Sequence, residues 1–250
     1  MAPPLSVQLY SLRTEAAADL EGVLRRLGRA GFVGVEPAGL HGMEPETFRA
    51  IVADSGLVVS SAHTELPVGS KANQVLDEQE TIGNRFLING SGPADFADRD
   101  AIKRTAETFN EAAANARARG MEVGYHNHWW EFDHTVDGEV PYDVLGSLLD
   151  PSVFMEIDIY WAQVGGHDPA AVIRAQGERA RFLHVKDGPL DPPSPMTAAG
   201  AGRVDLAAAL AAGGFAEWHV VELDACGTDM FAAVEESQRY LVGSGFSSGR

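Results

Sequence analysis

The chain has 250 residues, 45% of them hydrophobic, which is enough to fill the core of one large domain. Its 36 acidic and 19 basic residues give a net charge of -17, and no basic run is present, so nucleic acid and anionic membrane surfaces are excluded as expected partners. The chain has one cysteine, no signal-like start and no apolar run near the roughly 18 residues of a membrane span, so a cytoplasmic protein is expected.

Short apolar runs alternate with amphipathic, alanine-rich stretches along the chain. The expected strands comprise residues 5–9, 33–36, 58–63, 86–89, 122–126, 153–159, 181–186 and 219–223. The expected helices comprise residues 19–30, 44–55, 73–82, 100–119, 142–149, 168–176, 204–212 and 229–242. Alternation sustained in this way predicts a parallel α/β sheet.

The first strand decides between a closed barrel and an open sheet. It is followed by Tyr10-Ser11-Leu12-Arg13, which lacks the Gly-x-Gly-x-x-Gly turn of a dinucleotide-binding fold. We therefore predict a single-domain (β/α)8 TIM barrel over residues 1–242. The glycine- and serine-rich residues 243–250 are expected to form a flexible tail.

Polar residues occur at the carboxyl ends of most expected strands, where such barrels place their active sites. Asp158, His184 and Glu222 lie on three successive strands. One imidazole and two carboxylates suit a divalent ion such as Mn²⁺, Mg²⁺, Co²⁺ or Zn²⁺, and the residues do not select among these metals. A single acidic residue at a strand end is more often a helix cap, so the hypothesis rests on the three together.

Further residues at the same rim are candidates for binding substrate. Glu36 and His63 end the second and third strands, and Trp129 and Trp161 could stack on a sugar face or simply pack. Glu156 is ambiguous, because it could form an ion pair with Lys186 or an arginine inside the barrel.

The sequence resembles the sugar phosphate isomerase/epimerase branch of the xylose isomerase-like barrels. The resemblance spans essentially the whole chain. It is carried by Val7-Gln8-Leu9-Tyr10-Ser11-Leu12-Arg13, Gly124-Tyr125-His126-Asn127-His128-Trp129-Trp130-Glu131-Phe132, Glu156-Ile157-Asp158-Ile159-Tyr160-Trp161, His184-Val185-Lys186-Asp187, Gly200-Ala201-Gly202-Arg203-Val204-Asp205 and Val221-Glu222. It adds Gln8, Tyr10 and Arg13 to the expected substrate-binding residues.

The resemblance implies one divalent metal, held in the ketose 3-epimerases by Glu, Asp, His and Glu. Asp158, His184 and Glu222 match the last three ligands, whereas His126 stands at the position of the first glutamate. The expected ligands are therefore these four residues, with Glu131 as an alternative fourth ligand. His126 in place of a glutamate puts simple epimerisation by a pair of carboxylates in doubt.

The resemblance implies an isomerase or epimerase that acts on a ketose or related polyol through a metal-stabilised enediolate. Glu222 is the expected base, with His128, Lys186 or Glu131 returning the proton. A metal-dependent dehydratase acting on an inosose or keto-sugar is the first alternative, since such relatives use a histidine and a lysine similar to His128 and Lys186. A non-catalytic sugar-binding barrel is the second.

The expected partner is a small sugar or polyol, more simply an unphosphorylated one, because only Arg13 and Lys186 offer positive charge at the rim. The sequence also leaves open whether the chain forms a homo-oligomer. The loop at residues 187–203, rich in proline and glycine, is either an inert connection or a lid over the site.

Overall fold

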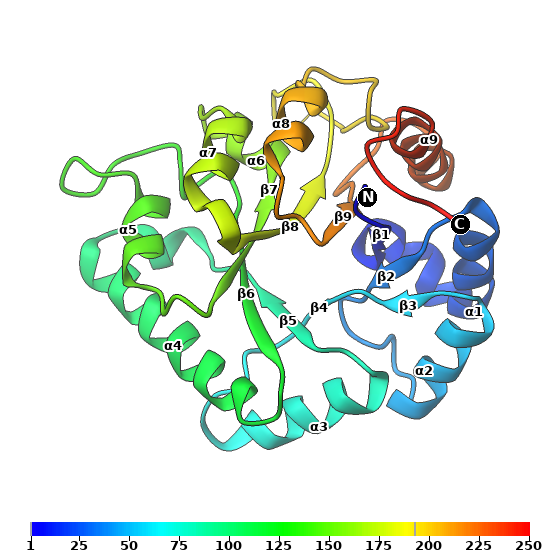
Figure 1. Ribbon diagram of the computed structural model, residues 1–250, viewed down its shortest axis with the longest axis horizontal. Helices are drawn as coiled ribbons and strands as arrows, with labels where there is room; N and C mark the ends of the chain where they lie inside the picture. Colours follow the sequence, from blue (N-terminus) through cyan, green and yellow to red (C-terminus); the bar gives the residue numbers. More distant parts are fainter. Residues whose placement is uncertain (1, 193) are drawn as a thin grey trace.

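The computed structural model describes residues 2–192 and 194–250. Parallel strands form a central ring with helices around it (Figure 1). The strands are β1 (Leu5–Gln8), β2 (Gly34–Glu36), β3 (Val58–Val59), β4 (Ala62–His63), β5 (Phe86–Asn89), β6 (Glu122–His126), β7 (Phe154–Asp158), β8 (Ala180–Val185) and β9 (Trp218–Val221).

The strand order is β3-β2-β1-β9-β8-β7-β6-β5-β4, and every pairing in it is parallel. The ring closes because β3 and β4 are two halves of one bent strand, separated by Ser60 and Ser61. The first half pairs with β2 and the second with β5. The predicted TIM barrel is confirmed.

The α-helices lie outside the ring (Figure 1). They are α1 (Arg13–Ala30), α2 (Pro45–Asp54), α3 (Ala72–Ile82), α4 (Arg99–Arg117), α5 (Pro141–Leu148), α6 (Ile159–Val164), α7 (Pro169–Gln176), α8 (Leu206–Ala212) and α9 (Met230–Gly243). Short 3-10 turns η1 (Leu9–Leu12), η2 (Gly69–Lys71), η3 (Pro93–Phe96) and η4 (Gly177–Arg179) precede or follow several of them.

Two differences from the expected elements have local causes. The single strand expected at residues 58–63 is split, because the Ser60 hydroxyl bonds to Ser6 Oγ and to the Val35 carbonyl and draws the bend inward. The first helix begins before residue 19 but is kinked there. Asp19 leaves helical geometry, and its side chain accepts a hydrogen bond from Gly22 N at 2.9 Å, which starts the segment that the sequence predicted.

The amino-terminal end of the barrel is filled by an apolar plug, which leaves the carboxyl-terminal end for polar chemistry. The plug consists of Ile88, Phe154, Phe182 and Val220. Gly124 makes room for it, since a Cβ there would lie 2.3 Å from the Phe154 ring. Along β7 the next inward positions are Glu156 and Asp158, because inward residues alternate on a strand.

The carboxyl-terminal segment, where a flexible tail was expected at residues 243–250, contacts the amino-terminal end of the barrel. Leu5 N donates to the Ser248 carbonyl, Ser248 N donates to Pro3, and Arg250 N donates to Gly31. Main-chain hydrogen bonds of this kind offset the entropy that a segment rich in glycine and serine loses when it is ordered.

Burial beneath this segment lowers the pKa of His219 to about 4. Its Nδ1 lies 2.9 Å from Ser247 Oγ. The unfolded chain takes up a proton below the ordinary histidine pKa of about 6.5, whereas the folded chain does not. Stability should therefore fall as the pH drops from about 6.5 towards 4, by at most about 3 kcal/mol from this residue.

Urea unfolding of the natural protein and of His219→Gln between pH 4 and 8 measures this contribution. The natural protein should lose more stability below pH 6.5 than the variant. Equal pH dependence in the two proteins would contradict a neutral, buried His219.

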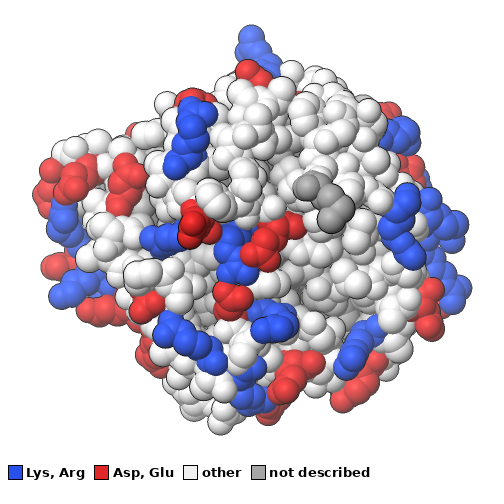
Figure 2. Space-filling model, viewed as in Figure 1, with Lys and Arg blue, Asp and Glu red and all other residues white. Residues whose placement is uncertain are grey.

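None of the described helices is long and apolar enough to cross a membrane. On the face shown in Figure 2, acidic and basic side chains intermix over most of the surface. Basic side chains gather only at the edge where Figure 1 places α1 and the carboxyl terminus. Two of the arginines of α1 are paired there, Arg25 with Glu21 and Arg26 with Glu235.

Candidate metal centre

Four side chains from neighbouring strands converge at the carboxyl-terminal end of the ring. His126 ends β6, Asp158 ends β7, His184 lies on β8, and Glu222 follows β9 directly. One potential ligand atom from each lies within 4.8 Å of the others, and all four residues are buried. The structure thus brings together the four residues expected to hold a metal.

Lys186, two residues beyond His184, is the cation that faces this group. Its Nζ lies 2.9 Å from Asp158 Oδ2, 2.7 Å from Glu222 Oε2 and 2.8 Å from Asp224 Oδ2. Burial opposes the ammonium charge, but the three carboxylates outweigh it and hold the pKa of Lys186 well above its ordinary value. Likewise burial opposes the Glu222 carboxylate, yet Lys186 and His184 hold its pKa well below the usual range.

A second group of polar side chains overlaps the first, which is called the upper group below (His126, Asp158, His184 and Glu222). His63, His126, Glu156 and His184 form an overlapping group whose potential ligand atoms also lie within 4.8 Å of one another. His63 Nε2 is 2.6 Å and His126 Nδ1 is 3.0 Å from the same oxygen of Glu156. These contacts fix both rings, so Glu156 pairs with histidines and not with Lys186 or an arginine.

The donor set fits a divalent cation. The four residues of the upper group supply two imidazoles and two carboxylates, a mixed nitrogen and oxygen set that suits Mn²⁺, Co²⁺ or Zn²⁺. Asp158 Oδ2 is buried and makes no hydrogen bond of good geometry within the described chain, although Lys186 Nζ is near. A buried carboxylate oxygen left in this way is a suitable cation ligand.

A hollow of about 340 Å³ opens above the upper group. Its polar lining includes Tyr10, Asn89, His128, Lys186 and Glu222. The volume lies within the roughly 300–1,000 Å³ of small-molecule sites. Two of the candidate metal ligands, His126 and Glu222, therefore line a space that can admit a small molecule.

Residues 24–242 match the sequence pattern of the xylose isomerase-like TIM barrel family. The chain belongs to this family. No curated protein matches the sequence significantly.

Several solved structures share the fold of this chain over nearly their whole length. A sugar phosphate isomerase/epimerase from Parabacteroides distasonis is 24% identical, with a TM-score of 0.85 over 99% of this chain and 96% of its own. A D-allulose 3-epimerase from a Methylomonas species is 15% identical, with a TM-score of 0.72 over 97% and 98%. A probable 3-DHS dehydratase from Bacillus anthracis is 13% identical, with a TM-score of 0.74 over 96% and 98%.

Glu131, expected as an alternative ligand or an acid–base residue, lies outside both groups of potential ligands. Its carboxylate is buried and accepts hydrogen bonds from Tyr125 Oη at 2.7 Å and from His128 N at 2.9 Å. With both oxygens engaged, it positions the turn that carries His128. His128 does reach the hollow, and its ring stacks on Trp130 at 4.2 Å.

The seven expected substrate-binding residues fall into three sets. Tyr10 and His63 line the hollow. Gln8 and Glu36 lie below it, completely buried, with Gln8 Nε2 donating to Glu36 Oε1 and that oxygen 2.7 Å from His184 Nε2. They belong to the support beneath the ligands and do not line the hollow.

The remaining three do not line the hollow. Arg13 is exposed, and its guanidinium donates to the carbonyls of Tyr10 and Asp224, two residues that do line it. Trp129 packs on Trp161 with ring centres 4.7 Å apart, and neither lines the hollow. Lys186 Nζ lies 5.4 Å from the Trp161 ring, which makes that tryptophan a wall beside the ammonium group.

Asn127, Asn89 and Asp224 also contribute, although sequence reasoning gave them no role. Asn127 exchanges hydrogen bonds with the main chain of Asp158 and so fixes the end of β7. Asn89 and Asp224 line the hollow. Their position at or within three residues of the ends of buried strands was the signal that could have identified them.

Asp187 holds the long loop between β8 and α8. Its carboxylate accepts hydrogen bonds from four main-chain N–H groups, those of Gly188, Gly200, Gly202 and Val204, at 2.8–3.1 Å. Met196, Ala198 and Ala199 are buried. Of the two interpretations of this loop, these contacts favour a fixed connection over a closing lid; residue 193 lies outside the described residues.

Replacing Asp187 with alanine should therefore lower the free energy of unfolding by about 3 kcal/mol or more, since several charge-assisted hydrogen bonds are lost together. Urea unfolding measures this effect. Asp191→Ala, an exposed change in the same loop, is the control and should leave stability near that of the natural protein.

Proposed function

We propose that this protein is a divalent-metal-dependent isomerase or epimerase that acts on a sugar or related polyol. The observation that carries the proposal is the buried group His126, Asp158, His184 and Glu222, of which His126 and Glu222 line a hollow at the end of the barrel where enzymes of this architecture work. The names of the neighbours in fold agree with carbohydrate chemistry.

The four residues would hold the metal, which when bound would polarise a sugar carbonyl and acidify the adjacent C–H bond. Glu222 is the proposed base, because it lines the hollow and Lys186 keeps it ionised. It would take the proton from carbon and leave an enediolate form of the substrate. The Lys186 ammonium, inside the same hollow, would stabilise the negative charge.

The fate of the proton sets the product. Its return to the neighbouring carbon gives an isomer, and its return to the opposite face of the same carbon gives an epimer. His128 is the proposed second acid–base group, since it lines the hollow and its buried Nδ1 has no hydrogen-bond partner within the described chain.

The test combines metal analysis with exchange in D₂O. The purified protein should carry a stoichiometric divalent metal or gain thermal stability from Mn²⁺ or Co²⁺. Incubation with ketoses and aldoses should then place deuterium at a retained carbon next to the carbonyl. Absence of both metal binding and exchange would overturn the proposal.

Dehydration is the runner-up and rests on one observation. His128 and Lys186 line the hollow together with Asp224, so a protonated group is available to a leaving hydroxyl. In the same D₂O experiment, a product lighter by one water would assign the protein to this reaction.

A further inference from the structure

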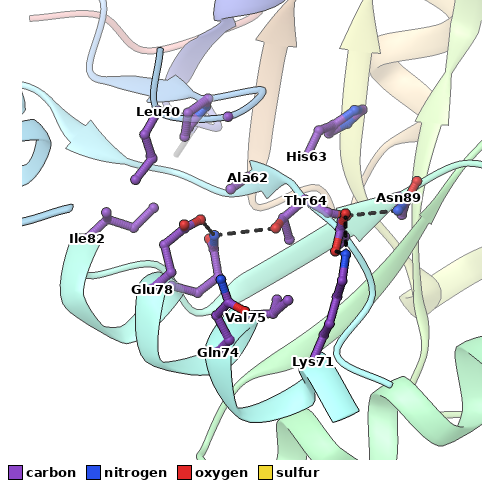
Figure 3. Close-up of a pocket in the computed structure, with 14 residues that line it drawn as sticks. Leu40, Ala62, His63, Thr64, Lys71, Gln74, Val75, Glu78, Ile82 and Asn89 are labelled. Carbon is purple, nitrogen blue, oxygen red and sulfur yellow. Dashed lines mark hydrogen bonds and ion pairs between the residues drawn. The ribbon is translucent and has the colours of Figure 1, made fainter. Parts of the chain in front are cut away.

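A second, larger cavity adjoins the hollow over the candidate metal centre. It measures about 550 Å³ and lies between β4, α3 and the loop that follows β2 (Figure 3). His63 and Asn89 line both spaces. The two spaces therefore meet at these side chains, and a molecule that reached around them would occupy both the hollow and this distal cavity.

The lining of the distal cavity suits a sugar ring. Leu40, Val75 and Ile82 give it an apolar side, and Thr64, Gln74 and Glu78 give it hydrogen-bonding groups (Figure 3). A pyranose has the same division between an apolar face and a polar edge, and it meets a protein through both.

Two amide groups are available for such a ring. Gln74 is exposed at the start of α3 and makes no side-chain hydrogen bond within the described chain. Asn89 donates through Nδ2 to the Thr64 carbonyl at 2.8 Å, which fixes its amide at the junction of the two spaces. Its Oδ1 accepts no hydrogen bond from the described residues and can receive one from a sugar hydroxyl.

The charges in both spaces disfavour a phosphate. The lining of the distal cavity contains Glu65 and Glu78, and Lys71 is paired with Glu65 at 3.0 Å. In the hollow, Lys186 is already surrounded by three carboxylates. Among the described lining residues, neither space offers an unpaired cation to an anionic group.

From these observations we infer that the substrate is an uncharged sugar extended by a second sugar unit, with the reacting ring over the metal ligands and the second ring in the distal cavity. This inference rests on the proposed function for the reacting ring. The hollow alone is near the lower limit of small-molecule sites, whereas the two spaces together lie well inside that range.

Calorimetric titration of the Mn²⁺-loaded protein tests the inference with four probes: D-fructose, lactulose, isomaltulose and D-fructose 6-phosphate. At least one of the two ketose disaccharides should bind about tenfold or more tightly than fructose, and the 6-phosphate should bind no more tightly than fructose. Disaccharides that bind no better than fructose, or a 6-phosphate that binds best, would overturn it.

Two variants locate the effect. Gln74→Trp places a bulky ring at the opening of the distal cavity and should remove most of the disaccharide's advantage. Asn73→Trp is the matched control, because Asn73 is the exposed neighbour on α3 and does not line the cavity, and it should keep the advantage. Equal loss in both variants would contradict the assigned position of the second ring.

Deuterium exchange, measured in parallel, separates this inference from the proposed function. Exchange on fructose without tighter binding of the disaccharides would support the proposed isomerase function and contradict a second sugar ring in the substrate. A clear disaccharide advantage without exchange on any probe keeps the extended ligand and overturns the isomerase.

Discussion

Glu222→Gln is expected to lower kcat by roughly 10²–10⁴-fold, the usual contribution of a general base. Glutamine keeps the size of the side chain and can still accept a hydrogen bond from Lys186, but it cannot take a proton from carbon. The measurement is the rate of deuterium exchange and of product formation at saturating substrate and metal, with the bound metal determined for each preparation.

Metal content separates the two roles of Glu222. Loss of exchange with retained metal identifies a base, whereas loss of both identifies a ligand. Glu217→Gln at the opposite end of the barrel, where Glu217 pairs with Arg181, is the control for removing a carboxylate elsewhere. Near-normal exchange in Glu222→Gln would contradict the assignment of Glu222 as the base.

Asp158→Asn is expected to weaken Mn²⁺ or Co²⁺ binding by more than roughly 10²-fold, beyond the effect usual for residues that only support a metal ligand. Asp158 has a second role, because its Oδ1 accepts a hydrogen bond from Trp161 N at 2.8 Å and caps α6. Asparagine can retain that cap while it removes the charge, so the loss should appear in metal affinity and not in folding.

Metal titration followed by the thermal shift measures this effect. Asp168→Asn is the matched control, since Asp168 caps α7 in the same way but lies outside the groups of potential ligands. Unchanged metal affinity in Asp158→Asn would contradict the assigned site.

The barrel could be predicted from the sequence because its signal is local. Apolar runs and glycine stops recur in phase, and a closed ring is the simplest packing for them. The bend at Ser60 could not be predicted, since it depends on hydrogen bonds to Ser6 and Val35, which are distant in the chain. The order at residues 243–250 depends in the same way on partners such as Pro3 and Gly31.

The candidate site was predictable to a similar degree. Strand ends deliver their side chains to one rim, so Asp158, His184 and Glu222 could be grouped without a structure. The depth of each side chain could not be read from the sequence. Glu36 faces inward but lies below the ligands, and Glu131 turns towards Tyr125.

Three of the four tryptophans form one cluster beside the hollow, and Trp130 stacks on His128, which lines it, with the ring planes 11° apart. An indole is the main source of protein fluorescence. The emission of this chain therefore comes mainly from beside the candidate site. Occupancy of the hollow can be followed optically in the unlabelled protein, without a chromophore on the sugar.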